Sequence, residues 1–494
     1  MSSVRRSVLF SAVDRYVTQV LMIGTTMVMA RILTPAETGL FFVANAVVLL
    51  AENFREFGVS SFIVQERTIS RAVVRSAFTV TLVLSMLMGL AFYLGAAGIA
   101  GFYGEPDLQR LIEVATISIL VIPFATPALS LLRRDLAFRA LAVINITAAV
   151  ANAGVTIVLG FAGFGPMSYM WGYVASNAII AVVAFGFRPG LWMYGPSLFQ
   201  IRRLLSFGAA SCSVTLLNMA YEMLPRLAFG KILGFDAVGL YARAVTVCQL
   251  PDKTVVSALQ PVVLPAMAVR VRAGGALKTS YLRGFELMSA IQWPMLIMLA
   301  ILADPVVAIL LGSQWGEVAP LVRLIAIGTM ALAPAFLTYP VLVAAGRVQD
   351  TLYASLISIP PSIVAMIVAA NMFGLAGVAA SLLVIAPFQM LVALLFIRRA
   401  IGLSLVEMAH TARASALLTL GTAIVPVIVL AVSPTGFDMD WLHAGLAVLG
   451  GAVGWLVALR LTRHPLGAEI LAALRIVAGR RGQPQPTLPA TPLD

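Results

Sequence analysis

The sequence predicts an all-α, polytopic protein that crosses a membrane about fourteen times. Three observations lead to this prediction: 61% of the 494 residues are hydrophobic, only 11% are charged, and the apolar residues gather in long runs separated by short polar loops. Ordinary soluble domains carry roughly 25% charged residues, and part of any soluble surface must be polar. A water-soluble fold could not cover this much apolar surface.

Each apolar run of about 20 residues is long enough to span the hydrocarbon core as a helix. The first six spans are expected near residues 8–30, 40–62, 77–100, 111–131, 139–161 and 166–187. The next six are expected near 205–229, 238–263, 285–311, 321–343, 351–372 and 376–397, and a final pair near 411–432 and 441–461. These spans divide the chain into a six-helix lobe (1–200), a second six-helix lobe (201–400), helices 13 and 14 (401–464) and a cytoplasmic, partly disordered tail (465–494).

A short polar turn occurs once in each lobe. Residues 30–41 read ARILTPAETGLF, and residues 230–241 read GKILGFDAVGLY. Because each lobe holds an even number of spans, both lobes enter the membrane from the same face, which predicts a pseudo-twofold axis along the membrane normal. The matched residues are Arg31 and Lys231, Ile32 and Ile232, Leu33 and Leu233, Gly39 and Gly239, Leu40 and Leu240, Phe41 and Tyr241, and further along Tyr103-Gly104-Glu105 and Trp315-Gly316-Glu317.

Charge in the loops predicts the orientation of the chain. Most of the 33 Lys and Arg residues fall in alternate loops, on the same side as both termini, and few fall in the loops between them. Cytoplasmic loops retain Lys and Arg, so both termini are predicted to be cytoplasmic. This distribution also explains the net charge of +12 without a nucleic-acid partner.

No catalytic or metal-binding pattern is visible in the sequence. The three histidines are scattered, Cys212 and Cys248 lie in apolar runs, and the Gly-rich stretch 274–279 lacks the spacing of a phosphate-binding loop. The loops are too short for a catalytic domain outside the membrane. The chain is therefore predicted not to be an enzyme, and neither a metal nor a cofactor is expected.

Charged residues inside the expected spans are the candidates for function. Each costs about 2.5–3.5 kcal/mol at the centre of a membrane helix on insertion scales, so such residues usually face protein or a wet cavity. Glu52 matches Asp252 at the repeat offset, and all the candidates lie on the first two spans of a lobe. The basic candidates for substrate binding are Arg15, Arg55, Arg226, Arg243 and Lys253. The acidic candidates for coupling or charge pairing are Asp14, Glu52, Glu56, Glu222 and Asp252.

Two interpretations of each charge remain open. It can line a central hydrophilic cavity, or it can lock two helices together or extend to the cytoplasmic interface. The clustering of the charges as a set favours a central cavity between the two lobes.

The turn at 31–35, with Gly39-Leu40-Phe41 after it, and the six-plus-six-plus-two organisation resemble the Wzx-type polysaccharide flippases. These form a branch of the multidrug/oligosaccharidyl-lipid/polysaccharide exporter superfamily, and the sequence as a whole, including residues 54–58, resembles its exopolysaccharide exporters in particular. The resemblance implies a protein of the bacterial inner membrane that works by alternating access. It would move an undecaprenyl-diphosphate-linked oligosaccharide from the cytoplasmic to the periplasmic leaflet for lipopolysaccharide, capsule or exopolysaccharide biosynthesis. Membrane lipids, a polysaccharide polymerase and export machinery are the other implied partners.

The resemblance gives the intramembrane charges expected roles. A diphosphate needs fixed cations in a region of low dielectric constant, and the fork of an arginine can donate two hydrogen bonds to it. Arg15 and Arg55 are the first choices. The carboxylates would neutralise the arginines in the empty protein, or would take up H⁺ or Na⁺. The membrane potential could also drive export, since each charge that crosses is worth about 2.3 kcal/mol per 100 mV.

Four other functions stay open at this point. Two belong to the same superfamily: a lipid II flippase, which would carry a peptidoglycan precursor, and a drug/cation antiporter. A polysaccharide polymerase or ligase would be an enzyme and would be expected to carry a larger periplasmic loop. A scaffold without transport activity would have a dry centre and fully paired charges.

Overall fold

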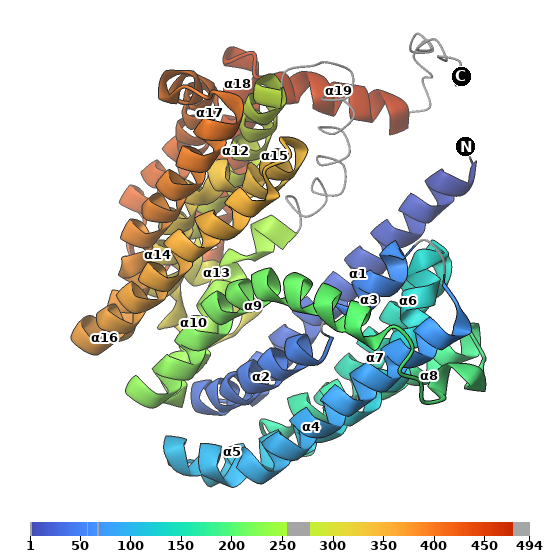
Figure 1. Ribbon diagram of the computed structural model, residues 1–494. Helices are drawn as coiled ribbons and strands as arrows, with labels where there is room; N and C mark the ends of the chain where they lie inside the picture. Colours follow the sequence, from blue (N-terminus) through green and yellow to red (C-terminus); the bar gives the residue numbers. More distant parts are fainter. Residues whose placement is uncertain (1, 57, 67–68, 254–276, 478–494) are drawn as a thin grey trace, which may run out of the picture. The chain divides into compact units, whose positions relative to one another are not determined.

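The computed structural model describes residues 2–56, 58–66, 69–253 and 277–477. All elements in this part of the chain are helices (Figure 1). Nine helical segments are long and apolar enough to cross a membrane, and a bent pair makes a tenth, when only the described residues are considered. The predicted all-α, multi-pass membrane fold is confirmed, whereas the number of fourteen spans stays a prediction.

The chain folds into two compact units, which are described separately. Unit 1 comprises Met1–Val247, Val306–Ile325 and Leu352–Gln389, and unit 2 comprises Cys248–Pro305, Ala326–Thr351 and Met390–Asp494. Several helices contribute residues to both units. The expected division into lobes 1–200 and 201–400 is a statement about the sequence repeat and stays a prediction.

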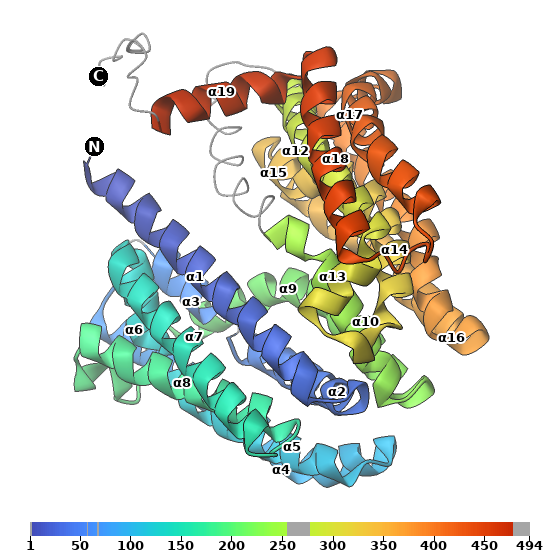
Figure 2. The same cartoon turned by 180° about the vertical axis from the view of Figure 1, so that it is seen from behind.

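Unit 1 contains the candidate site. Its helix α1 lies along α7, α7 pairs with α8, α4 packs against α5, and α2 packs against both α5 and α9 (Figure 2). The helices that lie wholly or almost wholly in unit 1 are α1 (Ser2–Ile32), α2 (Pro35–Glu56), α3 (Val59–Gln65), α4 (Arg71–Tyr103), α5 (Pro106–Val121), η1 (Ile122–Phe124), α6 (Thr126–Arg134), α7 (Phe138–Phe161), α8 (Met167–Phe187), η2 (Leu191–Tyr194), α9 (Ile201–Ile232), α10 (Phe235–Cys248) and η4 (Ser313–Trp315).

In unit 2, α17 packs against both α12 and α18. A capping box begins α17, where Ser404 and Glu407 satisfy each other's backbone N–H groups. Asp440 caps α18 by accepting a hydrogen bond from the His443 N–H. The remaining helices of the described residues are α12 (Leu277–Ile301), α13 (Ala303–Leu310), α14 (Val318–Thr329), η5 (Met330–Leu337), α15 (Thr338–Ala344), α16 (Val348–Ile401), α17 (Leu405–Val432), α18 (Trp441–Leu461) and α19 (Pro465–Val477).

The expected spans coincide with helices, but four of them are broken, and the span near 285–311 divides at Leu302 between α12 and α13. The span near 40–62 divides at Gly58, which has a φ of 65°. The span near 111–131 bends by 47° around η1 and Pro123, and the span near 321–343 is interrupted by η5 with Pro334. Proline lacks the backbone N–H of a helix interior, so it weakens the helix at these points. The span near 238–263 is described only as far as residue 253.

Two further differences concern the second half. Helix α16 is continuous through two expected spans except at Gly374, whose φ of 63° and ψ of −153° separate the two parts. Helix α19 occupies the start of the expected tail and packs against α12 and α18. Residues 478–494, where disorder is expected, lie outside the described part of the chain.

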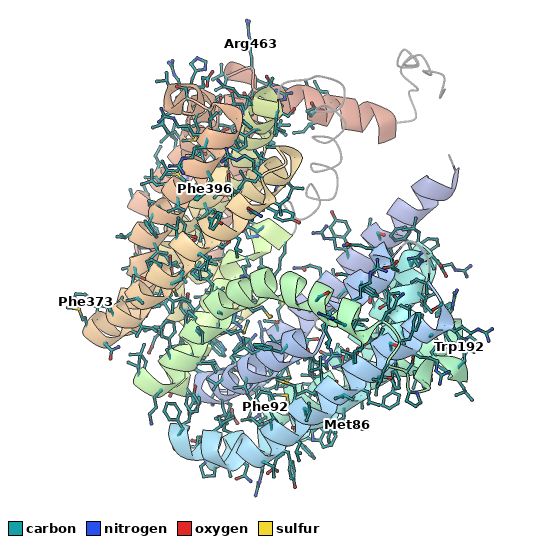
Figure 3. The ribbon with its side chains drawn as sticks, viewed as in Figure 1. Met86, Phe92, Trp192, Phe373, Phe396 and Arg463 are labelled. Carbon is teal, nitrogen blue, oxygen red and sulfur yellow. The ribbon has the colours of Figure 1, made fainter. Side chains whose placement is uncertain are left out.

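Large apolar side chains project outward from the long helices (Figure 3). Met86 on α4 is 54% exposed, and Phe373 on α16 is 69% exposed. Exposed apolar surface of this kind is costly in water and favourable in lipid. The outward faces of the helices therefore suit a hydrocarbon environment, which leaves the polar residues of the bundle to be explained.

Candidate functional site

The larger cavity of unit 1 lies between α1, α7 and α8. Its volume is about 670 Å³, and polar and charged side chains contribute to its wall on all three helices. These side chains are Asp14, Arg15, Thr18, Gln19, Thr25 and Thr26 from α1, Asn145 and Asn152 from α7, and Tyr169, Tyr173 and Ser176 from α8.

Asp14 fixes α1 to α7 at the wall of this cavity. Asn145 Nδ2 donates a hydrogen bond of 2.8 Å to Asp14 Oδ2, and Thr18 Oγ1 lies 3.4 Å from Asp14 Oδ1. Arg15 is the next residue of α1 and also lines the cavity. The structure thus brings both predicted charges of α1 to one wall, where Asp14 also has the helix-locking role that was left open.

A smaller cavity of about 270 Å³ adjoins the larger one, since Asn145 and Ile180 line both. Arg55 and Glu56 from the end of α2 line it, together with Ser60 from α3 and Arg133 from α6. Arg55 is buried, with 6% of the residue exposed. Its Nε has no hydrogen-bond partner, and the structure shows no hydrogen bond from its guanidinium to any described residue.

Glu52 connects α2 to the larger cavity. The Tyr173 hydroxyl donates a hydrogen bond to Glu52 Oε2, and Tyr173 itself lines the larger cavity. Glu52 and Glu56 are the acidic neighbours of Arg55 on the same helix. All three predicted charges of α2 therefore lie at, or one side chain from, the two cavities.

The charges of α9 and α10 have a different environment. Arg243 Nη2 donates a 2.9 Å hydrogen bond to the hydroxyl of Tyr169, a residue of the cavity wall. The Arg243 guanidinium carbon also lies 5.7 Å from the centre of the Phe42 ring and 5.6 Å from that of Trp315. The guanidinium of Arg226 lies 5.6 Å from the Phe42 ring, and Glu222 is exposed one turn earlier on α9. Neither Arg226 nor Glu222 lines a cavity described here.

The last two predicted residues belong to unit 2. Gln292 Nε2 donates a 2.8 Å hydrogen bond to Asp252 Oδ1, so Asp252 joins α12 to the segment after α10. Lys253 is adjacent to it. Their position relative to the cavities of unit 1 is not part of the described geometry, and their predicted roles stay predictions.

Several residues of the cavity wall were not predicted, because the sequence argument considered only charges inside spans. Tyr169 and Tyr173 are four residues apart, and Asn145 and Asn152 are seven apart, so each pair lies on one face of its helix. A search for polar stripes at helical spacing would have found them. Arg133 falls between the spans expected near 111–131 and 139–161 and so was not a candidate, although the last turn of α6 brings it into the wall of the smaller cavity.

The arrangement has the chemistry of a binding site for an anionic, hydroxyl-rich ligand. Three arginines and two carboxylates line the two cavities: Arg15, Arg55, Arg133, Asp14 and Glu56. Asparagine amides and tyrosine hydroxyls can both donate and accept hydrogen bonds. Among the residues that the structure describes, no group of three or more His, Cys, Asp or Glu side chains is placed to hold a metal ion.

A multi-pass helical bundle with a charged internal cavity has the architecture of a membrane transporter. Solved structures confirm this class of fold. The lipid II flippase MurJ in an inward closed conformation superposes with a TM-score of 0.73 at 13% identity, over 91% of this chain and 97% of MurJ. An inward-facing multidrug resistance MATE family transporter of the MOP superfamily superposes with a TM-score of 0.63 at 15% identity, over 78% of this chain and 94% of the transporter.

The family model described as polysaccharide biosynthesis protein matches residues 28–320, and the chain belongs to this family. Its relatives include the lipopolysaccharide biosynthesis protein WzxC of Escherichia coli K12, which is 26% identical over 308 residues. The match covers 61% of each chain, so this protein aligns with less than two thirds of the length of WzxC. The succinoglycan biosynthesis transport protein ExoT of Rhizobium meliloti is 26% identical over 70% of each chain. The predicted resemblance to Wzx-type proteins is confirmed.

Proposed function

We propose that this protein is a flippase for an undecaprenyl-diphosphate-linked oligosaccharide. It would move this lipid-linked precursor from the cytoplasmic to the periplasmic leaflet of the bacterial inner membrane by alternating access, for exopolysaccharide or lipopolysaccharide biosynthesis. The observation that carries the proposal is the pair of adjoining, arginine-containing cavities in a fold shared with a lipid II flippase. Membership of the polysaccharide biosynthesis family supports the choice of a glycan precursor.

The two cavities suit the two parts of such a head group. Arg55 and Arg133 line the smaller cavity, where the buried Arg55 has donors to spare for a diphosphate. The larger cavity offers amides and tyrosine hydroxyls, the groups that recognise sugar hydroxyls. Asn145 lines both cavities, so the proposed sugar and phosphate sites would be neighbours.

The remaining parts of the proposal concern the orientation of the protein in the membrane and the energy source for transport. Both termini would lie in the cytoplasm, and the protein would perform transport rather than catalysis. The membrane potential would favour outward movement of a negative head group by about 2.3 kcal/mol per charge and 100 mV. H⁺ or Na⁺ would return on the carboxylates Asp14, Glu52 or Glu56. A polysaccharide polymerase and export machinery would receive the product.

The proposal is tested by replacing Arg55 in a strain that lacks the chromosomal gene. Arg55→Ala should abolish surface polysaccharide, because a buried phosphate site then loses its fixed cation, and Arg55→Lys should restore part of the activity because it keeps the charge without the fork. Arg133→Ala should have the same direction and a smaller effect. The measurement is surface polysaccharide per amount of protein in the membrane.

Arg188→Ala is the matched control, since Arg188 is half-exposed and forms a 2.7 Å ion pair with Asp135 outside both cavities. Wild-type polysaccharide with Arg55→Ala, at equal protein abundance, would exclude Arg55 from the transport site. The alternatives are separated in related strains. A lipid II flippase would support growth of cells depleted of MurJ, and a drug/cation antiporter would raise resistance to ethidium.

A further inference from the structure

The two copies of the repeated turn pack directly against each other. A Cβ added to Gly39 on α2 would collide with the carbonyl oxygen of Phe235, and a Cβ added to Gly239 on α10 would collide with the carbonyl oxygen of Pro35. Phe235 is the repeat counterpart of Pro35, so the contact is reciprocal, as in a twofold interface. Only glycine lets the two backbones approach this closely.

Two aromatic side chains strengthen this crossing in the same reciprocal manner. The Tyr103 hydroxyl donates a 2.9 Å hydrogen bond to the carbonyl oxygen of Leu227 on α9. Its counterpart Trp315 donates a 2.7 Å hydrogen bond from Nε1 to the carbonyl oxygen of Ala30 on α1. Each repeat therefore holds the end of the first helix of the other repeat.

The matched basic residues behave alike. Arg31 Nη2 donates a 2.8 Å hydrogen bond to the carbonyl oxygen of Ile309, and Lys231 Nζ donates a 2.5 Å hydrogen bond to that of Phe102. All four acceptors are backbone carbonyls. We refer to Gly39, Gly239, Tyr103, Trp315, Arg31 and Lys231 together as the reciprocal clasp.

Tyr169 connects the reciprocal clasp to the larger cavity. Its ring stacks on Phe41, with centroids 4.5 Å apart and an interplanar angle of 20°, and Phe41 follows Gly39 by two positions. Its hydroxyl accepts the hydrogen bond from Arg243, which follows Gly239 by four positions and lies over the Trp315 ring. One side chain of the cavity wall thus touches both copies of the repeated motif.

We propose that the reciprocal clasp is the closed extracytoplasmic gate of the transporter, and that Tyr169 and Arg243 transmit the occupancy of the larger cavity to it. The repeated turns lie at the ends of the helices opposite the arginine-rich loops, so this end faces away from the cytoplasm in the proposed orientation. A ligand hydroxyl that donates to the Tyr169 hydroxyl oxygen competes with Arg243 for this acceptor. Release of Arg243 then loosens its contact with Trp315. The proposal rests on the proposed function only in taking the chain as an alternating-access transporter.

The gate is tested by thiol accessibility from both sides of the membrane. Val43 is 0% exposed and lies 2.9 Å from where a Cβ on Gly230 would stand, so Val43→Cys reports on the α2 and α9 contact near the clasp. Ala149→Cys reports on the larger cavity. Each is placed in a background with Cys212→Ser and Cys248→Ala. A membrane-impermeant maleimide is applied to whole cells for Val43→Cys and to inside-out vesicles for Ala149→Cys.

Trp315→Phe keeps the ring and removes one hydrogen bond of the closed gate. We expect about fivefold faster labelling of Val43→Cys and slower labelling of Ala149→Cys, because loss of one hydrogen bond shifts the balance between two states by about this factor. Tyr103→Phe should act in the same way. Trp171→Phe and Tyr93→Phe, both exposed in the structure, are the matched controls and should change neither rate.

Tyr169→Phe keeps the stacking on Phe41 and removes only the link to Arg243. It should shift the two labelling rates in opposite directions, and its effect should be non-additive with that of Trp315→Phe, since both act on one connected element. Gly39→Ala should produce the largest shift, with Gly24→Ala as control because no atom lies within 4 Å of a Cβ there.

A clasp that only stabilises the fold would give a different result. Its variants would then speed labelling at both positions or at neither, and either outcome would overturn the gate. The labelling rates do not depend on polysaccharide export. The test therefore remains valid if the proposed substrate is wrong.

Discussion

Arg55 in the wall of the smaller cavity and Arg243 beside the reciprocal clasp are both buried arginines of unit 1, but their surroundings differ. Arg243 is 3% exposed, donates from Nη2 to Tyr169 and lies near two aromatic rings, while its Nε has no hydrogen-bond partner. Arg55 is 6% exposed and makes no hydrogen bond to any described residue. A buried charge is costly unless its donors are satisfied. The difference therefore separates an arginine that holds the protein together from one whose donors remain available to a ligand.

The comparison predicts unequal losses of stability when each arginine is replaced by an apolar residue of similar length. Arg243→Met should lower the free energy of unfolding by about 2 kcal/mol, because it loses a charged hydrogen bond and two cation–π contacts, less the desolvation cost of the arginine. Arg55→Met should lower it by less, about 1 kcal/mol, because no hydrogen bond of Arg55 to a described residue is lost and only its charge interaction with Glu52 and Glu56 disappears. Thermal unfolding of both variants in the same detergent measures the difference.

Equal losses of stability in these two variants would mean that Arg55 is as firmly bound as Arg243, and the distinction drawn above would then be wrong. Export separates the two residues in the other direction. Arg55→Met should have no export activity, whereas any loss with Arg243→Met should follow the amount of folded protein in the membrane and the shift of the gate.

The helical membrane fold could be predicted from the sequence because every segment that crosses a membrane must be apolar and must satisfy its own backbone hydrogen bonds. About 20 apolar residues must form a helix there, since no water satisfies the backbone. The breaks at η1 and η5 were harder to predict, because Pro123 and Pro334 are each compatible with a kinked continuous helix. Helix α19 was assigned to the tail, since a short amphipathic segment after the last span gives little signal against a disordered one.

The site could be predicted only in part, and the reason is again physical. Asp14, Arg15 and Arg55 were found because a charge inside a span is costly enough to require an explanation. Arg226 and Glu222 satisfy the same criterion, but the rotation of α9 about its axis decides which of its faces lines a cavity, and the sequence does not contain that rotation. Neutral polar residues such as Asn145 carry a smaller cost in a membrane and therefore a weaker signal.

Asp14 offers a smaller test at the larger cavity, which adjoins the cavity that Arg55 lines. Asp14→Asn removes a negative charge beside Arg15 and leaves an amide oxygen to accept from Asn145, so stability should change little. Asp14→Ala leaves Asn145 Nδ2 without this acceptor and should cost about 1 kcal/mol. Both variants should bind undecaprenyl diphosphate about fivefold more tightly, because the net positive charge of the cavity wall increases.

Binding is measured with the purified protein in nanodiscs, and unfolding is followed in the same preparation. Weaker binding by Asp14→Asn would show that the carboxylate contributes to the ligand site rather than competing with it. A loss of stability as large as that of Asp14→Ala would instead show that the charge itself, and not the hydrogen bond, joins α1 to α7.

The smallest expected effect is a pH dependence that originates in unit 2, at a buried group that is satisfied in only one protonation state. His464 is 3% exposed; its Nδ1 accepts a 3.1 Å hydrogen bond from the Leu466 N–H, and its Nε2 lies 3.4 Å from Ser415 Oγ. Burial lowers the pKa of His464 below its ordinary value of 6.5, with a further lowering from Arg283 and an opposing influence of Glu286. Protonation would remove the acceptor at Nδ1 that holds the start of α19.

The sign of the effect follows from this lowered pKa. Above about pH 6.5 the imidazole of His464 is neutral in both the folded and the unfolded protein, and its contribution to stability is fully present. As the pH falls from there toward the lower pKa of the folded state, the unfolded chain binds more protons and the contribution is lost. The melting temperature of the wild type should therefore decline over this interval more than that of His464→Gln, which cannot titrate. Parallel pH profiles for the two proteins would show that α19 is held by its apolar contacts with α12 and α18, and not by the neutral imidazole.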